Sequence, residues 1–130
     1  MTKEQINKLN REIDSICINW QDVFARNNTP KNLVALNFGL QKIYDGYEIY
    51  LDGYDWFDEQ DDIWLLDSIW GPDENFISLS YGFNLFDEAE VFSIYNKNIS
   101  EKIRSGKMVL PATIKYATVC LVKGKPQRVM

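Results

Sequence analysis

The feature that most constrains this chain is a stretch of 54 residues, 43–96, that contains no lysine and no arginine. Its acids are Asp45, Glu48, Asp52, Asp55, Asp58, Glu59, Asp61, Asp62, Asp67, Asp73, Glu74, Asp87, Glu88 and Glu90, which make 14 of the chain's 19 carboxylates. All 14 lysines and arginines and the other five acids lie outside, so the middle carries −14 charges and the two ends together +9. Burying an unpaired carboxylate is costly. These side chains must therefore lie at the surface or meet cations supplied by the ends.

The same stretch holds 14 of the 18 aromatic residues. Some of these rings must be core, because aromatic side chains bury large areas. The remainder can act as surface anchors, since Trp and Tyr often dominate the binding energy of protein interfaces. A surface of one charge sign that also carries large rings suits the binding of a basic protein partner.

Length and composition predict one domain covering residues 1–130, with enough apolar residues to exclude wholesale disorder. The chain starts with the polar sequence MTKEQINK, and no apolar run approaches the roughly 18–20 residues that cross a bilayer. We therefore expect a cytoplasmic protein without membrane contact. Cys17 and Cys120 fall in apolar patterns and are expected to be reduced core thiols.

The chain has no histidine, which excludes Ser-His, Cys-His and zinc-histidine chemistry. Carboxylate chemistry stays open, but no residue set in the sequence is typical of an enzyme. We expect a protein that is not an enzyme, with no catalytic residue, no cofactor and no metal.

The N-terminal segment shows the clearest periodicity. A single apolar stripe predicts a helix over about residues 3–27, formed by Ile6, Leu9, Ile13, Ile16, Trp20, Val23 and Phe24. Thr2 followed by Gln5 fits a capping box. The run Asn27-Asn28-Thr29-Pro30 ends the helix, because proline cannot donate to a continuing one.

Thr29 and Pro30 also suit the start of a second helix. The spacing that favours it, up to about residue 47, comes from Leu33, Leu36, Leu40, Ile43 and Tyr47. A strand over residues 33–40 is the alternative.

The rest of the chain predicts a sheet and one more helix. Strand-forming runs lie at 47–52, 63–70 and 76–81, and short turns between them favour an antiparallel meander. Residues 84–105 predict a helix that ends before Gly106, and residues 113–122 predict a final strand followed by a basic, frayed tail. The expected fold class is α+β, with N-terminal helices and a later helix packed on an antiparallel sheet of about four strands.

The candidate site is the acidic, aromatic loop between the first two predicted strands. The residues predicted to bind a partner are Asp52, Tyr54, Asp55, Trp56, Asp58, Glu59, Asp61 and Asp62. Trp56 is the favoured exposed anchor, because Trp64 and Trp70 fall in a predicted strand and suit the core.

Other interpretations of the loop remain. Its aspartates could bind calcium or magnesium, although the alternating pattern of a calcium loop is absent. Two of them, such as Asp58 and Asp62, could form an acid–base pair. The loop could also be a solvated face that keeps the chain in solution.

Direct binding to nucleic acid is not expected, because phosphate contacts need a basic groove and the basic residues lie at the two ends. The charge instead indicates a protein that competes with nucleic acid for a basic partner. A nucleic-acid mimic or a regulatory adaptor that binds a basic protein is therefore one hypothesis for the function.

In size and character the chain resembles the immunity proteins of bacterial contact-dependent growth inhibition and related polymorphic toxin systems. The mixture of acidic and aromatic residues is similar to that of such proteins, from residues 54–59, Tyr-Asp-Trp-Phe-Asp-Glu, through to Trp70-Gly71-Pro72. The resemblance implies tight binding to one cognate toxin domain, often a basic nuclease. It implies that the protein covers the active site or an essential surface of that toxin.

Overall fold

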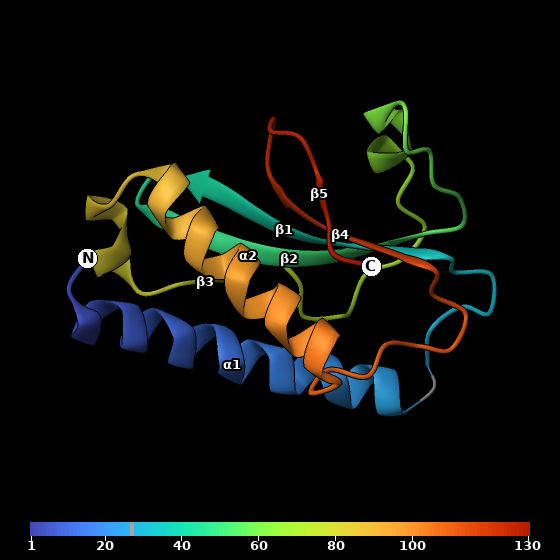
Figure 1. Ribbon diagram of the computed structural model, residues 1–130, viewed down its shortest axis with the longest axis horizontal. Helices are drawn as coiled ribbons and strands as arrows, with labels where there is room; N and C mark the ends of the chain where they lie inside the picture. The colour runs from blue at the N-terminus through green and yellow to red at the C-terminus, as the bar shows by residue number, and fades with distance from the viewer. Residues whose placement is uncertain (27) are drawn as a thin grey trace.

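The computed structural model describes residues 1–26 and 28–130, which form an α+β fold with two α-helices on one face of a five-stranded sheet (Figure 1). The elements are α1 Lys3–Ala25, β1 Ala35–Ile43, β2 Gly46–Tyr54, β3 Ile77–Ser78, α2 Glu88–Ser105, β4 Tyr116–Leu121 and β5 Gln127–Arg128, with short 3-10 helices η1 Asp62–Leu66 and η2 Tyr81–Leu85. The predicted fold class is confirmed.

Helix α1 forms as its apolar stripe predicts. The capping box is present: Thr2 accepts from the backbone N–H of Gln5, and the Gln5 side chain accepts from the backbone N–H of Thr2. The buried stripe includes Leu9, Ile13 and Trp20. The helix ends at Ala25, and the predicted end at Asn27 lies outside the described residues.

The predicted second helix is wrong, and the alternative strand is present as β1. Strand β1 lies in the middle of the sheet, and its residues from Ala35 to Leu40 are buried on both sides. A strand covered on both faces loses the alternation of apolar and polar residues. Its leucines then match helical spacing by chance, and the polar Asn37 between them is buried in the sheet instead of lying on a solvated helix face.

The sheet has the order β3-β2-β1-β4-β5. Three of the pairs are antiparallel, but β1 and β4 are parallel, so the predicted all-antiparallel sheet is wrong at this pair. Helix α2 precedes β4 in the chain and packs on the sheet beside α1 (Figure 1). The predicted final strand is confirmed as β4.

Two predicted strands are largely replaced by other structure. Residues 62–66 form η1, and Trp70 makes a single antiparallel bridge to Gly53 instead of belonging to a strand. Only Ile77–Ser78 of the run 76–81 pairs with β2. Helix α2 begins later than predicted, at Glu88, where Asp87 caps its first turn. It ends at Ser105, and Gly106 follows with φ 78°, as the sequence predicts.

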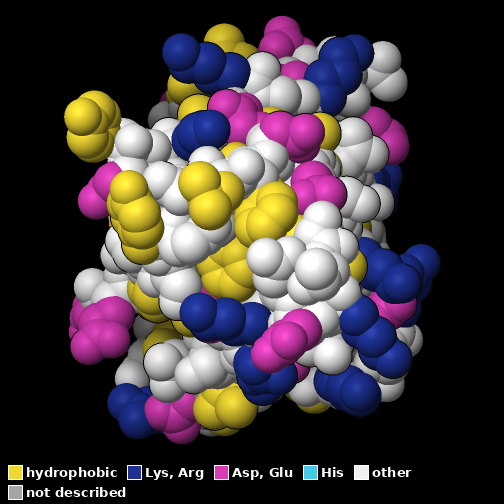
Figure 2. Space-filling view, turned by 90° about the vertical axis from the view of Figure 1, so that its left-hand side faces the viewer, with side chains coloured by type: hydrophobic (Ala, Val, Ile, Leu, Met, Phe, Trp, Pro, Cys, Tyr) yellow, Lys and Arg dark blue, Asp and Glu magenta, His cyan; other side chains and the backbone are white. Residues whose placement is uncertain are grey.

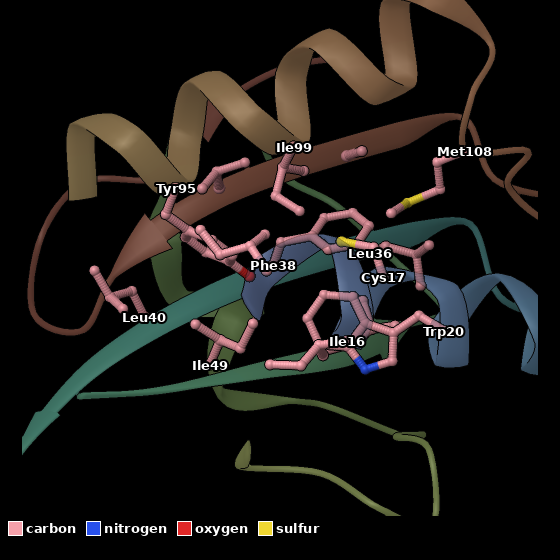
Figure 3. Close-up of a cluster of buried hydrophobic side chains, with 14 of the residues drawn as sticks. Ile16, Cys17, Trp20, Leu36, Phe38, Leu40, Ile49, Tyr95, Ile99 and Met108 are labelled. Carbon is pink, nitrogen blue, oxygen red and sulfur yellow. The ribbon is translucent and has the colours of Figure 1, made fainter. Parts of the chain in front are cut away.

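The main core lies between the helices and the sheet. Figure 3 shows Trp20 from α1, Phe38 from β1 and Ile99 from α2 pointing toward one another, and the rings of Trp20 and Phe38 lie 5.6 Å apart. Cys17 and Cys120 are free and buried, as predicted. Burial raises the pKa of the Cys17 thiol to about 12, which makes it unreactive at neutral pH.

Candidate protein-binding site

The acidic loop is held on the open face of the sheet, which we define as the face opposite α1 and α2. A second cluster of buried side chains lies there, formed by Ala35, Tyr54 and Trp64 with Val34, Phe57, Leu65 and Tyr116 packed against them. The Trp64 ring meets the ring of Tyr54 edge-on at 4.7 Å and that of Phe57 at 4.9 Å. These contacts fix the acidic segment, defined as residues 52–62, to the sheet.

Tyr54 is packed between the sheet and η1, where it holds the acidic segment in place. Its side chain is 1% exposed, and its hydroxyl donates to the backbone oxygen of Leu65 at 3.2 Å. A side chain buried to this extent does not contact a partner in this conformation. The predicted contact role of Tyr54 therefore gives way to a role in holding η1 in place.

Asp52 is also more buried than a predicted contact residue should be. It is half-buried, and its Oδ1 accepts a long hydrogen bond of 3.5 Å from Asn75 Nδ2. Asn75 is held by two backbone bonds to Leu51, at 2.9 and 2.8 Å. Burial raises the pKa of Asp52, and the Asn75 hydrogen bond offsets part of that rise.

Asp52→Asn is expected to stabilise the protein at neutral pH. Because the folded state raises the pKa of this carboxyl, its ionisation favours the unfolded chain. The gain in urea midpoint should be present at pH 7 and should disappear as the pH falls to about 2.5, well below the ordinary aspartate pKa, where the carboxyl is protonated in both states. The exposed Asp45→Asn is the control and should leave the midpoint unchanged at both pH values. Equal effects of the two substitutions would contradict the assignment.

The remaining predicted contact residues lie at or near the surface. Asp55, Glu59, Asp61 and Asp62 are exposed, Asp58 is half-buried, and Trp56 is 37% exposed. The Asp58 and Asp61 carboxylates accept from the backbone N–H groups of residues 60 and 63, at 2.8 and 3.0 Å, and so shape the loop. The Trp56 indole donates to Asp67 at 3.2 Å, which orients its ring.

Apolar residues that the sequence assigned to a strand extend this surface. Ile63 is 53% exposed, Leu66 81% and Ile69 44%. The 3-10 turn of η1 buries Trp64 against the sheet and leaves these neighbours in solvent. Together with Trp56 they provide apolar area beside the acids.

Few acids of the cation-free stretch are neutralised within the molecule. Among the described residues, two of the 14 have a cation within 4 Å: Glu59 pairs with Arg128 at 2.8 Å, and Glu90 pairs with the N-terminal amino group at 3.3 Å. In the part of the chain that the structure describes, the basic ends therefore form ion pairs with the acids of this stretch at two points.

A groove separates the acidic segment from the C-terminal arm, defined as residues 123–130. Its volume is about 530 Å³, and its lining includes Asp58, Glu59, Asp61 and Asp62 on one side and Lys125 and Arg128 on the other. The prediction of a frayed tail is wrong, because β5 pairs with β4 and carries Arg128 onto the open face. Figure 1 shows η1 and the β4–β5 hairpin rising from the same side of the sheet.

Metal and acid–base chemistry have little geometric support here. In the described part of the chain, no group of three or more His, Cys, Asp or Glu side chains is close enough to hold a metal ion. An acid–base pair needs two carboxyls whose pKa values are driven apart in one pocket. The raised pKa of Asp52 arises from burial beside Asn75 and not from a second carboxyl.

A scan of protein-family models, a search of curated proteins and a search of solved structures gave no match to this chain. Within the described residues, no helix combines the length and the apolar character needed to cross a lipid bilayer.

Figure 2 shows the end of the molecule that lies opposite the acidic segment, where charges of both signs surround a hydrophobic patch. The acidic segment lies away from that mixed surface, at the η1 end of the sheet (Figure 1).

Proposed function

We propose that this protein binds and neutralises a basic protein, as an immunity protein does for a cognate nuclease-type toxin, and that the acidic segment is its docking surface. The observation that carries the proposal is the set of acids without a cation within 4 Å among the described residues, 12 of the 14 in the cation-free stretch. Like charges held this close repel each other in the free protein, and the cations of a partner relieve that repulsion.

The apolar side chains beside the acids supply what charge alone lacks. Electrostatic complementarity mainly raises the association rate and selects the partner, whereas affinity needs buried apolar anchors. Trp56, Leu66 and Ile69 are exposed on or beside η1 and suit that role. The second cluster holds the loop before binding, which lowers the entropy lost on association.

Association with the protein encoded directly upstream of this reading frame tests the proposal. We expect the association rate to fall steeply between about 25 and 300 mM salt, because screening shortens the reach of the acidic surface. The double substitution Asp55→Asn with Asp62→Asn should lower the rate about tenfold at low salt. Both side chains are exposed and have no ion pair among the described residues.

Asp73→Asn with Glu74→Gln is the matched control. These two acids are also exposed and belong to the same cation-free stretch, but they lie outside the acidic segment. Surface plasmon resonance should show a change of less than about twofold for this pair. Equal losses for the two double variants would argue against the acidic segment as the docking surface, and an upstream domain that does not bind would argue against the immunity role.

A further inference from the structure

The guanidinium of Arg128 occupies a defined position on the open face. Its Cζ lies 4.9 Å from the ring centre of Tyr116 and 5.6 Å from that of Phe57, within the range of cation–π contacts. Its Nη1 donates to Glu59 at 2.8 Å. We define the guanidinium site as Phe57, Glu59 and Tyr116. Its two rings stack on each other at 4.3 Å.

We propose that this site binds an arginine of the partner protein and that Arg128 fills it in the free protein. The inference rests on the proposed function and names the side chain that the docking surface recognises. The seated guanidinium shows which chemistry fits. A planar guanidinium lies over aromatic rings and pairs with a carboxylate through several N–H donors, whereas the ammonium of lysine does neither as well.

Arg128 is held weakly enough to be replaced. Its side chain is 42% exposed, and that of Glu59 is 64% exposed. Exposed ion pairs and exposed cation–π contacts each contribute little, because water screens and competes for both. A partner arginine would make the same ion pair and the same cation–π contacts. It would also be held by the rest of the interface, which gives it an advantage over Arg128.

The exchange requires a rotation of the Arg128 side chain and the loss of the hydrogen bond from its Nε to the backbone oxygen of Met130 at 3.1 Å. The backbone of β5 stays paired with β4 through Thr118, and the N–H of Val129 donates to Ala117 at 2.9 Å. The rings are held independently of the arm, because Phe57 also contacts Trp64 edge-on. The site therefore keeps its shape when its occupant leaves.

The neighbouring groove gives the incoming chain a route to the site. Asp58, Asp61 and Asp62 line its acidic side next to Glu59. Arginines that flank the inserted one would meet these carboxylates along the groove. A partner segment with several arginines therefore fits better than a single isolated cation.

Peptide binding tests the inference without the natural partner. The probes are hexa-arginine and hexa-lysine peptides, measured by isothermal titration calorimetry at low salt against the full chain. Arg128→Ala is expected to bind hexa-arginine about tenfold more tightly than the unsubstituted protein, because the competing occupant is gone. Hexa-lysine should gain much less. Circular dichroism checks that each variant is folded.

Lys125→Ala is the matched control, because Lys125 is an exposed cation of the same arm that lines the same groove. It removes the same charge and should change hexa-arginine affinity by less than about threefold. Adding Glu59→Gln to Arg128→Ala should remove most of the gain.

Equal gains for Arg128→Ala and Lys125→Ala would overturn the guanidinium site and leave the acidic docking surface intact. So would an equal preference of Arg128→Ala for the two peptides. If no form of the protein binds either peptide, the proposed function fails together with this inference.

Discussion

Trp64→Ala is expected to lower the free energy of unfolding by about 3–5 kcal/mol, although Trp64 lies in a 3-10 turn outside the main core. The side chain is 1% exposed and sits between the rings of Tyr54 and Phe57. Its removal leaves a cavity under the acidic segment that the fixed strands cannot close. Urea denaturation followed by far-ultraviolet circular dichroism measures the loss.

Trp56→Ala is the matched control for this substitution. Trp56 is 37% exposed and makes one side-chain hydrogen bond, to Asp67. Its removal should cost clearly less than the removal of Trp64, about 1–2 kcal/mol of the free energy of unfolding. Similar losses for the two tryptophans would mean that the second cluster does not hold the loop. In hydrogen exchange, Trp64→Ala should also reduce protection in residues 62–66 more than in β1.

Gly39→Ala is the second substitution with a large expected effect. A Cβ atom at this position would lie 1.9 Å from Cζ of Tyr50, because the tyrosine ring lies directly on the glycine of the paired strand. Tyr50 would have to move, and its stack on Phe76, with ring centres 4.9 Å apart, would be disturbed. Overpacking of this kind costs about 1–3 kcal/mol, which should appear as a lower urea midpoint.

Two further variants decide whether the clash is the cause. Gly82→Ala adds the same atom where nothing lies within 4 Å, so its effect should stay within about 0.5 kcal/mol. The double variant Gly39→Ala with Tyr50→Ala should be less unstable than the sum of the two single losses, because the second change removes the obstructing ring. Strict additivity would show that the alanine acts through something other than Tyr50.

The structure was predictable from the sequence where local signals decide it. Helix α1 has its own stripe, its own capping box and a polar outer face, so each part of the segment indicates the same structure. Strand β1 was not predictable in this way. What makes it a strand is its position between β2 and β4, and β4 lies far along the chain. A local pattern of leucines carries no information about such neighbours.

The exposed acids of the site were predictable from the sequence, whereas the positions of its aromatic and basic side chains were not. The exposure of Asp55, Glu59 and Asp62 could be expected, since carboxylates without nearby cations avoid burial. The burial of Tyr54 could not, because it depends on η1 folding back over the sheet. Arg128 was missed as well: it is 69 positions from Glu59, and composition located the positive charge at the end of the chain without showing where that end lies.

The parallel pairing of β1 with β4 has a consequence for biosynthesis. Asn37 of β1 and Thr118 of β4 share a buried hydrogen bond across 81 positions of sequence. During translation, β1 and β2 leave the ribosome long before β4 does, and one edge of β1 has no strand to pair with until then. Open edges of apolar strands promote aggregation. Messages truncated before codon 116 should therefore yield insoluble product, while shortening the chain after β4 should be tolerated far better.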